Sequence, residues 1–190
     1  MAAKHILRYL RGTIHYYLKY EKGKDVLLTR FTNSYGGGSE KDGRSTTKAC
    51  ISLGSLMVSW MSRKQETVTL SSAEVEYVAT CEVNREAIWL RKLLSDLFAR
   101  PLAPTTIHCD NTSCIRLSED PLFHGKTKHI NNKYHYIQKL VQDGALKLEH
   151  VRTNEQTANI LTKALPNKNL VYFRDKLGLV DMSSLFERER

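Results

Sequence analysis

The sequence changes from strand-like to helix-like spacing of apolar residues at Ser71. Three strand-like runs precede this point, over residues 26–33, 48–54 and 56–62. The last two are separated by a tight turn at Gly54–Ser55, which favours an antiparallel hairpin. Residues 71–98 then place apolar side chains at helical spacing, behind the capping-box pattern Ser71-x-x-Glu74. This order predicts an antiparallel meander with a long helix packed on one face.

The remainder of the chain alternates helical and strand-like patterns. Strands are predicted over residues 105–109 and 146–151, and helices over 112–117, 132–142 and 155–163. An amphipathic helix is predicted over residues 2–11, because Ala3, Ile6, Leu7 and Leu10 share one face. The elements together predict an α/β fold with a mixed five-stranded sheet, flanking helices and an extra N-terminal helix. We divide the chain into an N-terminal helix and linker, a main domain and a C-terminal extension, over residues 1–20, 21–166 and 167–190.

Composition limits the partners more than it limits the fold. The 29 Lys and Arg outnumber the 20 Asp and Glu, and the net charge of +9 favours nucleic acid or another polyanion. With 41% hydrophobic residues the chain can bury a core, which excludes a disordered protein. We expect no membrane span, and residues 1–13 lack the apolar region of a conventional signal peptide. No CxxC pair is present, so buried free thiols are expected for Cys50, Cys81, Cys109 and Cys114.

Two carboxylates stand at positions where a charge is costly. Glu76 shares the apolar stripe of the long helix with residues such as Val83 and Leu90, so it should face the sheet. A buried carboxylate is expensive unless it is paired or binds a metal; the alternative is a small helix rotation that brings Glu76 to solvent. Asp110 follows the strand 105–109, at the sheet edge where ligands bind in such folds. The alternative role for Asp110 is a simple helix N-cap.

Seven stretches of the chain carry a resemblance to a known family. They are AKHILRYLRGT (3–13), SWMSRKQ (59–65), LSSAEVEY (70–77), IWLR (88–91), CDN (109–111), FHGKTKHI (123–130) and ANILTK (158–163). In this order they resemble the ribonuclease H region of copia-type retrotransposon polyproteins, as far as about Gly178. The resemblance implies a ribonuclease H-like α/β fold and cleavage of the RNA strand of RNA–DNA hybrids.

The same resemblance implies a metal site, from which this sequence departs. In the family, four carboxylates hold two divalent cations that activate a water and stabilise the leaving oxygen. Motif matching places two of the four at Glu76 and Asp110, whereas the other two positions are occupied by Asn33 and Asn159. Each missing close charge is worth about 4 kcal/mol at an effective dielectric of about 20. We therefore expect weak or no metal binding, an inactive domain, and no cofactor except Mg²⁺ if residual nuclease activity exists; the alternative is that a neighbouring acid takes over.

Basic residues are candidates for nucleic-acid contacts. Arg63 and Lys64 are expected on one loop, and Lys126, Lys128 and His129 on another. The net charge makes RNA or an RNA–DNA hybrid a plausible partner, although ordinary solvated side chains are the alternative. The histidines His124, His129 and His135 lack further ligands at suitable spacing, so no metal cluster is expected there.

A second resemblance concerns the tetrapeptide Arg8-Tyr9-Leu10-Arg11. It is similar to the RxLR motif of effectors that oomycete pathogens secrete into plant cells, although no acidic EER motif follows it here. This resemblance implies a secreted protein that is delivered to the host cytoplasm or nucleus, binds an unknown host protein and suppresses defence or cell death. Three hypotheses follow: a non-catalytic binding domain used as an effector, a weakly active and otherwise intracellular hybrid nuclease, and a transposon fragment without function.

Overall fold

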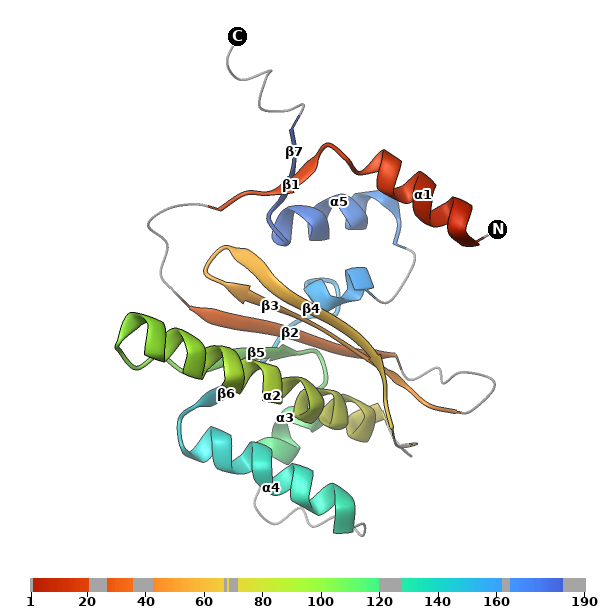
Figure 1. Ribbon diagram of the computed structural model, residues 1–190. Helices are drawn as coiled ribbons and strands as arrows, with labels where there is room; N and C mark the ends of the chain where they lie inside the picture. Colours follow the sequence, from red (N-terminus) through yellow and green to blue (C-terminus); the bar gives the residue numbers. More distant parts are fainter. Residues whose placement is uncertain are drawn as a thin grey trace.

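The computed structural model describes residues 2–20, 27–35, 43–66, 68, 72–119, 128–161 and 165–182 (Figure 1). Its main sheet has the strand order β4-β3-β2-β5-β6. The strands are β2 (Leu28–Tyr35), β3 (Thr46–Leu53), β4 (Leu56–Lys64), β5 (Thr105–Cys109) and β6 (Leu146–His150). The first three pair antiparallel, and β5 and β6 run parallel to β2. The predicted mixed five-stranded sheet is therefore confirmed.

Helices cover both faces of this sheet. Within the described residues the helices are α1 (Ala2–Gly12), α2 (Ser72–Phe98), α3 (Thr112–Glu119), α4 (Lys128–Gln142), the 3₁₀ helix η1 (Thr157–Leu161) and α5 (Asn167–Lys176), of which α2, α3, α4 and η1 pack on the sheet. One face packs against α2, α3 and α4, where Tyr77, Ile107 and Ile137 belong to one buried apolar cluster. The opposite face packs against η1, through Cys50 and Ala158. All four cysteines are free and buried, as predicted.

A second, smaller sheet joins distant parts of the chain. Strand β1 (Tyr16–Leu18) pairs antiparallel with β7 (Leu179–Asp181), close to α5 (Figure 1). Gly178 has φ +74°, and a Cβ atom there would overlap Leu56 Cδ2, so this position needs glycine. The sequence patterns did not predict β1, α5 or β7. These strands link the predicted N-terminal linker to the predicted C-terminal extension, and the division into three parts stays a prediction.

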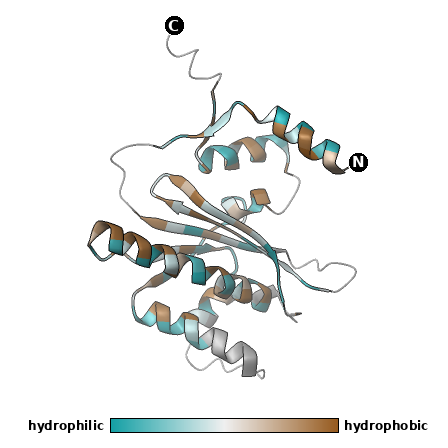
Figure 2. Ribbon diagram, viewed as in Figure 1, coloured by the Kyte–Doolittle hydropathy of each residue, from teal (hydrophilic) through white to brown (hydrophobic). Residues whose placement is uncertain are grey.

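The predicted N-terminal helix is present, but none of its residues is buried. Ile6, Leu7 and Leu10 are each more than half exposed. Figure 2 shows hydrophobic and hydrophilic residues alternating along this helix. Its amphipathic pattern therefore does not correspond to packing against the described part of the domain.

Several predicted boundaries are wrong. The helix expected over 155–163 is the shorter η1; residues Thr157, Ala158 and Asn159 are buried in succession, which a helix with a single buried face does not allow. Helix α4 begins at Lys128, so Lys128 and His129 lie in a helix and not in a loop. Arg63 and Lys64 also lie outside a loop, because their backbones pair with β3 at the end of β4. Ser71, His124 and Lys126 lie outside the described residues.

A cation is buried between the sheet and α2. Arg30 of β2 is 0% exposed, and its Nη1 donates to Asn84 Oδ1 over 2.6 Å. Its Nε and Nη2 have no hydrogen-bond partner within the described parts of the chain, and neither does Asn84 Nδ2. Burial lowers the pKa of Arg30 to about 9, although the negative charge of Glu86 opposes this shift. Such a group is expected to reduce the stability of the fold.

The double substitution Arg30→Met and Asn84→Leu should therefore raise the free energy of unfolding by about 1 kcal/mol or more. Asn84→Leu alone should lower it by about 2 kcal/mol, because the guanidinium then loses its hydrogen bond. Urea denaturation of the four proteins in this mutant cycle measures both effects. A double variant clearly less stable than the parent would show that the buried cation stabilises the domain.

Candidate functional site

The site is built on two neighbouring parallel strands. In the pairing of β2 with β5, Phe31 lies opposite His108, and continuing this register by two residues places Asn33 level with Asp110. Asp110 follows directly after Cys109, the last residue of β5. Both side chains thus start from the carboxyl ends of adjacent strands, the edge where such sheets bind ligands.

A third residue of the set comes from η1, on the face opposite α2. The buried amide of Gln156 donates to the carbonyl oxygens of Thr32 (2.8 Å) and His108 (3.2 Å), and it thereby ties η1 to β2 and β5. This places Asn159 beside Asn33, whose Nδ2 donates to Asn159 Oδ1. In turn, Asn159 Nδ2 donates to the carbonyl oxygen of Thr153 over 2.6 Å.

The fourth residue, Glu76, reaches the same edge from α2. Its side chain is 6% exposed, so the helix does not turn it towards solvent. Its Oε1 accepts hydrogen bonds from the backbone N–H (2.9 Å) and the hydroxyl (2.7 Å) of Ser34, the residue after Asn33. Its Oε2 is buried and has no hydrogen-bond partner among the described residues. The four positions that motif matching selected therefore converge at one end of the sheet.

The electrostatics of the site follow from this burial. Desolvation raises the pKa of Glu76 to about 7, against the two hydrogen bonds from Ser34, which lower it. The negative charge of Asp110 adds to the increase. A cation near both carboxylates would offset these costs, and the orphaned Oε2 of Glu76 offers it one ligand atom.

The donor set does not fit the two-cation arrangement that the family resemblance implies. Both polar atoms of the Asn159 amide already have protein partners, and Asn33 uses its amide nitrogen on Asn159. Of the four residues, only Glu76 and Asp110 bring negative charge. No group of three or more His, Cys, Asp or Glu that could hold a metal ion occurs in the portion of the chain that the structure describes. The expected weak metal binding stays a prediction.

Among the other candidates, the described residues belong to β4 and α4. Arg63 and Lys64 are exposed at the end of β4, and Arg63 lines a cavity of about 300 Å³ together with Glu82 and Glu86. Lys128 and His129 lie in the first turn of α4, and Lys126 lies outside the described residues. Contacts of these five residues with nucleic acid therefore remain a prediction.

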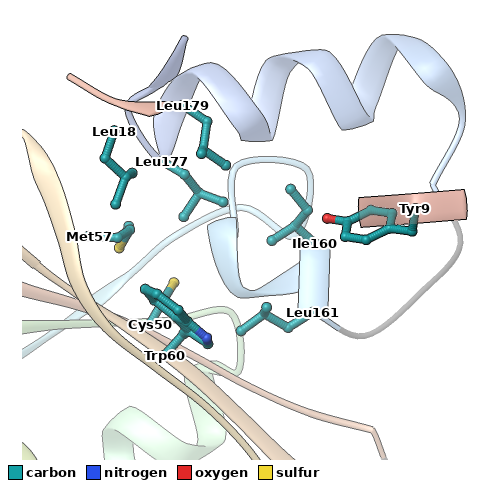
Figure 3. Close-up of a pocket in the computed structure, with 9 residues that line it drawn as sticks. All are labelled: Tyr9, Leu18, Cys50, Met57, Trp60, Ile160, Leu161, Leu177 and Leu179. Atoms are coloured by element: carbon teal, nitrogen blue, oxygen red, sulfur yellow. The ribbon is translucent and has the colours of Figure 1, made fainter. Parts of the chain in front are cut away.

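The RxLR-like tetrapeptide lies on the exposed helix α1. Its Tyr9 lines an apolar cavity of about 360 Å³ between the main sheet, η1 and the β1–β7 pair (Figure 3). Trp60 of β4 and Ile160 of η1 lie on other walls of this cavity. No helix among the described residues is both long and apolar enough to cross a membrane.

Sequence reasoning missed three residues that shape the site. They are Ser34, which binds Glu76; Thr153, whose carbonyl receives the amide of Asn159; and Gln156, which positions η1. Gln156 lies three residues before Asn159, but nothing in its spacing distinguishes a buried amide from an exposed one. Backbone acceptors such as that of Thr153 leave no signal in a sequence.

Comparisons with known proteins connect this geometry to a family. The chain is 38% identical over 178 residues to the retrovirus-related Pol polyprotein from transposon RE1 of Arabidopsis thaliana, across 94% of this chain and 12% of that protein. It is 35% identical to the corresponding polyprotein from transposon TNT 1-94 of Nicotiana tabacum, across 94% of this chain and 13% of that protein. The resemblance to copia-type retrotransposon polyproteins is confirmed. The chain spans about an eighth of the length of these relatives.

Solved structures agree on the fold. The ribonuclease H domain of Rv2228c from Mycobacterium tuberculosis matches 80% of this chain and 98% of its own, with a TM-score of 0.52 and 14% identity. A ribonuclease H1 isolated from compost matches 72% of this chain and 92% of its own, with a TM-score of 0.51 and 15% identity. The ribonuclease H-like fold is thereby confirmed. A search of family models found no match.

A shorter match concerns a protein named as a secreted effector. Over 89 residues, or 47% of this chain, the sequence is 39% identical to the secreted RxLR effector protein 161 of Plasmopara viticola. The match covers 63% of that protein.

The buried carboxylate yields a prediction about stability. The pKa of Glu76 is about 7 in the folded chain and near 4.5 when unfolded, so the parent should lose stability as the pH rises between these values. Glu76→Gln keeps an acceptor for Ser34 without the charge. Above pH 7 it should be more stable than the parent by on the order of 3 kcal/mol, and near pH 4 it should be equal. Thermal unfolding across this pH range measures the difference, with Glu119→Gln at an exposed position as the control; a constant difference would contradict the assignment.

Proposed function

We propose that this chain is a ribonuclease H domain of the copia retrotransposon type that binds RNA–DNA hybrids and cleaves them weakly or not at all. The observation that carries this proposal is the meeting of Asn33, Glu76, Asp110 and Asn159 at one end of the sheet, with two amides in place of carboxylates. The resemblance of this geometry to that of the family supports RNA–DNA hybrids as the substrate class. The replacement of two carboxylates by amides supports a reduced rate of hybrid cleavage.

Charge explains why cleavage should be weak. A pair of divalent cations brings four positive charges, which two carboxylates neutralise only by half. An amide oxygen can approach a hard cation but brings no negative charge. At an effective dielectric of about 20, each lost charge is worth about 4 kcal/mol at close range. The present sequence therefore lacks the negative charge that two such cations require.

Binding of an RNA–DNA hybrid should depend less than cleavage on the residues at positions 33 and 159. The net charge of +9 favours a polyanion, and contacts between basic side chains and phosphates supply most sequence-independent affinity. Arg63 and Lys64 are exposed at the end of β4, whereas the remnant carboxylates at Glu76 and Asp110 oppose contacts with phosphates. Affinity for a hybrid duplex should therefore fall with increasing salt, and it should not require a divalent cation.

A labelled RNA–DNA hybrid tests both parts of the proposal. The parent should bind it in the presence of EDTA and show little or no Mg²⁺- or Mn²⁺-dependent cleavage. Restoring both acids, Asn33→Asp with Asn159→Asp, should raise cleavage by at least about a hundredfold, since each charge stabilises bound cations by several kcal/mol.

Two controls make this result specific. Asn167→Asp with Asn169→Asp adds the same two negative charges at exposed positions of α5 and should leave cleavage unchanged. Glu76→Gln in the restored background should abolish the gained activity. Efficient cleavage by the parent, lost in Glu76→Gln, would overturn the proposed loss of rate; absence of any hybrid binding would overturn the proposed substrate class.

A second candidate function is that of a secreted effector. It is supported by the partial match to the Plasmopara viticola protein and by the exposed position of Arg8-Tyr9-Leu10-Arg11 on α1. If the chain acts in this way, its expression inside plant cells should reduce cell death after an immune trigger. The Asn33→Asp and Asn159→Asp variant serves as a comparison, because suppression should not depend on restored nuclease chemistry. Unchanged cell death would count against this role.

A further inference from the structure

We infer that the amides of Asn33 and Asn159 form a strut that holds η1 to β2 without a cation, and that carboxylates at both positions would make this contact depend on divalent metal. The inference rests on the assignment of these positions under the proposed function. It concerns how the site is held together and not whether it cuts a hybrid.

The strut is a relay of two hydrogen bonds. Asn33 Nδ2 donates to Asn159 Oδ1, and Asn159 Nδ2 donates to the carbonyl oxygen of Thr153 over 2.6 Å. The relay needs a side chain that donates and accepts at the same time, which an amide does. An ionised carboxylate is only an acceptor. Asparagine at 159 is thus chemically matched to both of its partners.

An acid at position 159 would replace the hydrogen bond from Asn159 to the Thr153 carbonyl with a repulsive contact. A carboxylate oxygen would then face the Thr153 carbonyl oxygen at hydrogen-bond distance, and two acceptors repel. Asn33 and Asn159 are 7% and 6% exposed, so water has little room to compensate for the lost bond. Asn159→Asp alone should therefore loosen η1.

An acid at position 33 is milder, because Asn159 can turn its amide. The turned amide donates to the new carboxylate at position 33, but its oxygen then faces the Thr153 carbonyl. The hydrogen bond between positions 33 and 159 becomes stronger, and the hydrogen bond from Asn159 to the Thr153 carbonyl is lost. With acids at both positions no donor remains in the relay, and two carboxylates stand close together beside Glu76 and Asp110. Only a cation between them would restore attraction across the site.

Glu76 adds to this dependence on a cation. Its Oε2 has no hydrogen-bond partner among the residues described, and its Oε1 is already held by Ser34. The parent pairs the amide nitrogen of Asn33 and both polar atoms of the Asn159 amide within the protein, and Oε2 of Glu76 has no partner among the described residues. The double variant would bring four carboxylates, at positions 33, 76, 110 and 159, to one end of the sheet. The expected order of cation dependence is therefore the double variant, then Asn159→Asp, then Asn33→Asp, then the parent.

Thermal unfolding in EDTA and in millimolar Mg²⁺ tests the strut. The parent should melt at the same temperature in both. In EDTA, Asn159→Asp should melt about 5 °C lower, as expected for losing a buried hydrogen bond in a domain of this size. The double variant should melt lowest in EDTA, and Mg²⁺ should raise its midpoint by more than that of any other variant. Asn169→Asp, the exposed control, should shift in neither condition.

Hydrogen exchange provides a second measurement if the double variant unfolds in EDTA. In Asn159→Asp, exchange should accelerate in residues 153–161 without a comparable change in α2, and Mg²⁺ should reverse it. Equal melting of Asn159→Asp and the parent in EDTA would overturn the inference. So would a Mg²⁺-induced shift that is as large in the parent as in the double variant.

These results can be separated from the test of function. A double variant that is stabilised by Mg²⁺ but does not cut the hybrid would leave the strut standing and refute the proposed loss of rate through missing acids. A double variant that cuts the hybrid, yet melts equally in EDTA and Mg²⁺, would refute the strut alone.

Discussion

The buried amide of Gln156 decides where the site is assembled. By donating to the carbonyl oxygens of Thr32 and His108, it binds a short 3₁₀ helix across two strands whose contacted residues are 76 positions apart in the sequence. This link, together with the Asn33–Asn159 hydrogen bond and the packing of Ala158 on Cys50, fixes Asn159 relative to Asn33. A neutral side chain thus helps to set the distance between Asn159 and Asn33, although neither it nor these two residues carries a charge. Its contribution comes from hydrogen bonds to two backbone carbonyls, of which that of His108 also accepts from the Thr32 hydroxyl.

Much of the sheet was accessible from the sequence because its strands are bounded by clear signals. The hairpin at Gly54–Ser55 and the change of spacing at Ser71 predicted the meander and the long helix. The small sheet was missed, because β1 and β7 have three residues each, too few to show alternation. Helix α5 was missed for a related reason: Phe173 is its only buried residue, so its apolar stripe is weak.

Some features of the candidate site could likewise be predicted from the sequence, and others could not. The burial of Glu76 could be predicted, since a carboxylate interrupts an otherwise apolar stripe. The places of Asn33 and Asn159 came from resemblance, because neither residue differs locally from any other polar residue. The contacts of Ser34, Thr153 and Gln156 could not be predicted. Each depends on a backbone group brought near by the tertiary fold, and backbone groups are identical at every position.

The pairing of β1 with β7 also has a consequence for biosynthesis. Residues 16–18 leave the ribosome before the strands of the main sheet, and their partners at 179–181 leave it after them. Strand β1 therefore stays unpaired during translation, until the strands of the main sheet and then β7 have been synthesised. The pairing of β1 with β7 is then a late folding step, which can form only after nearly the whole domain has been translated.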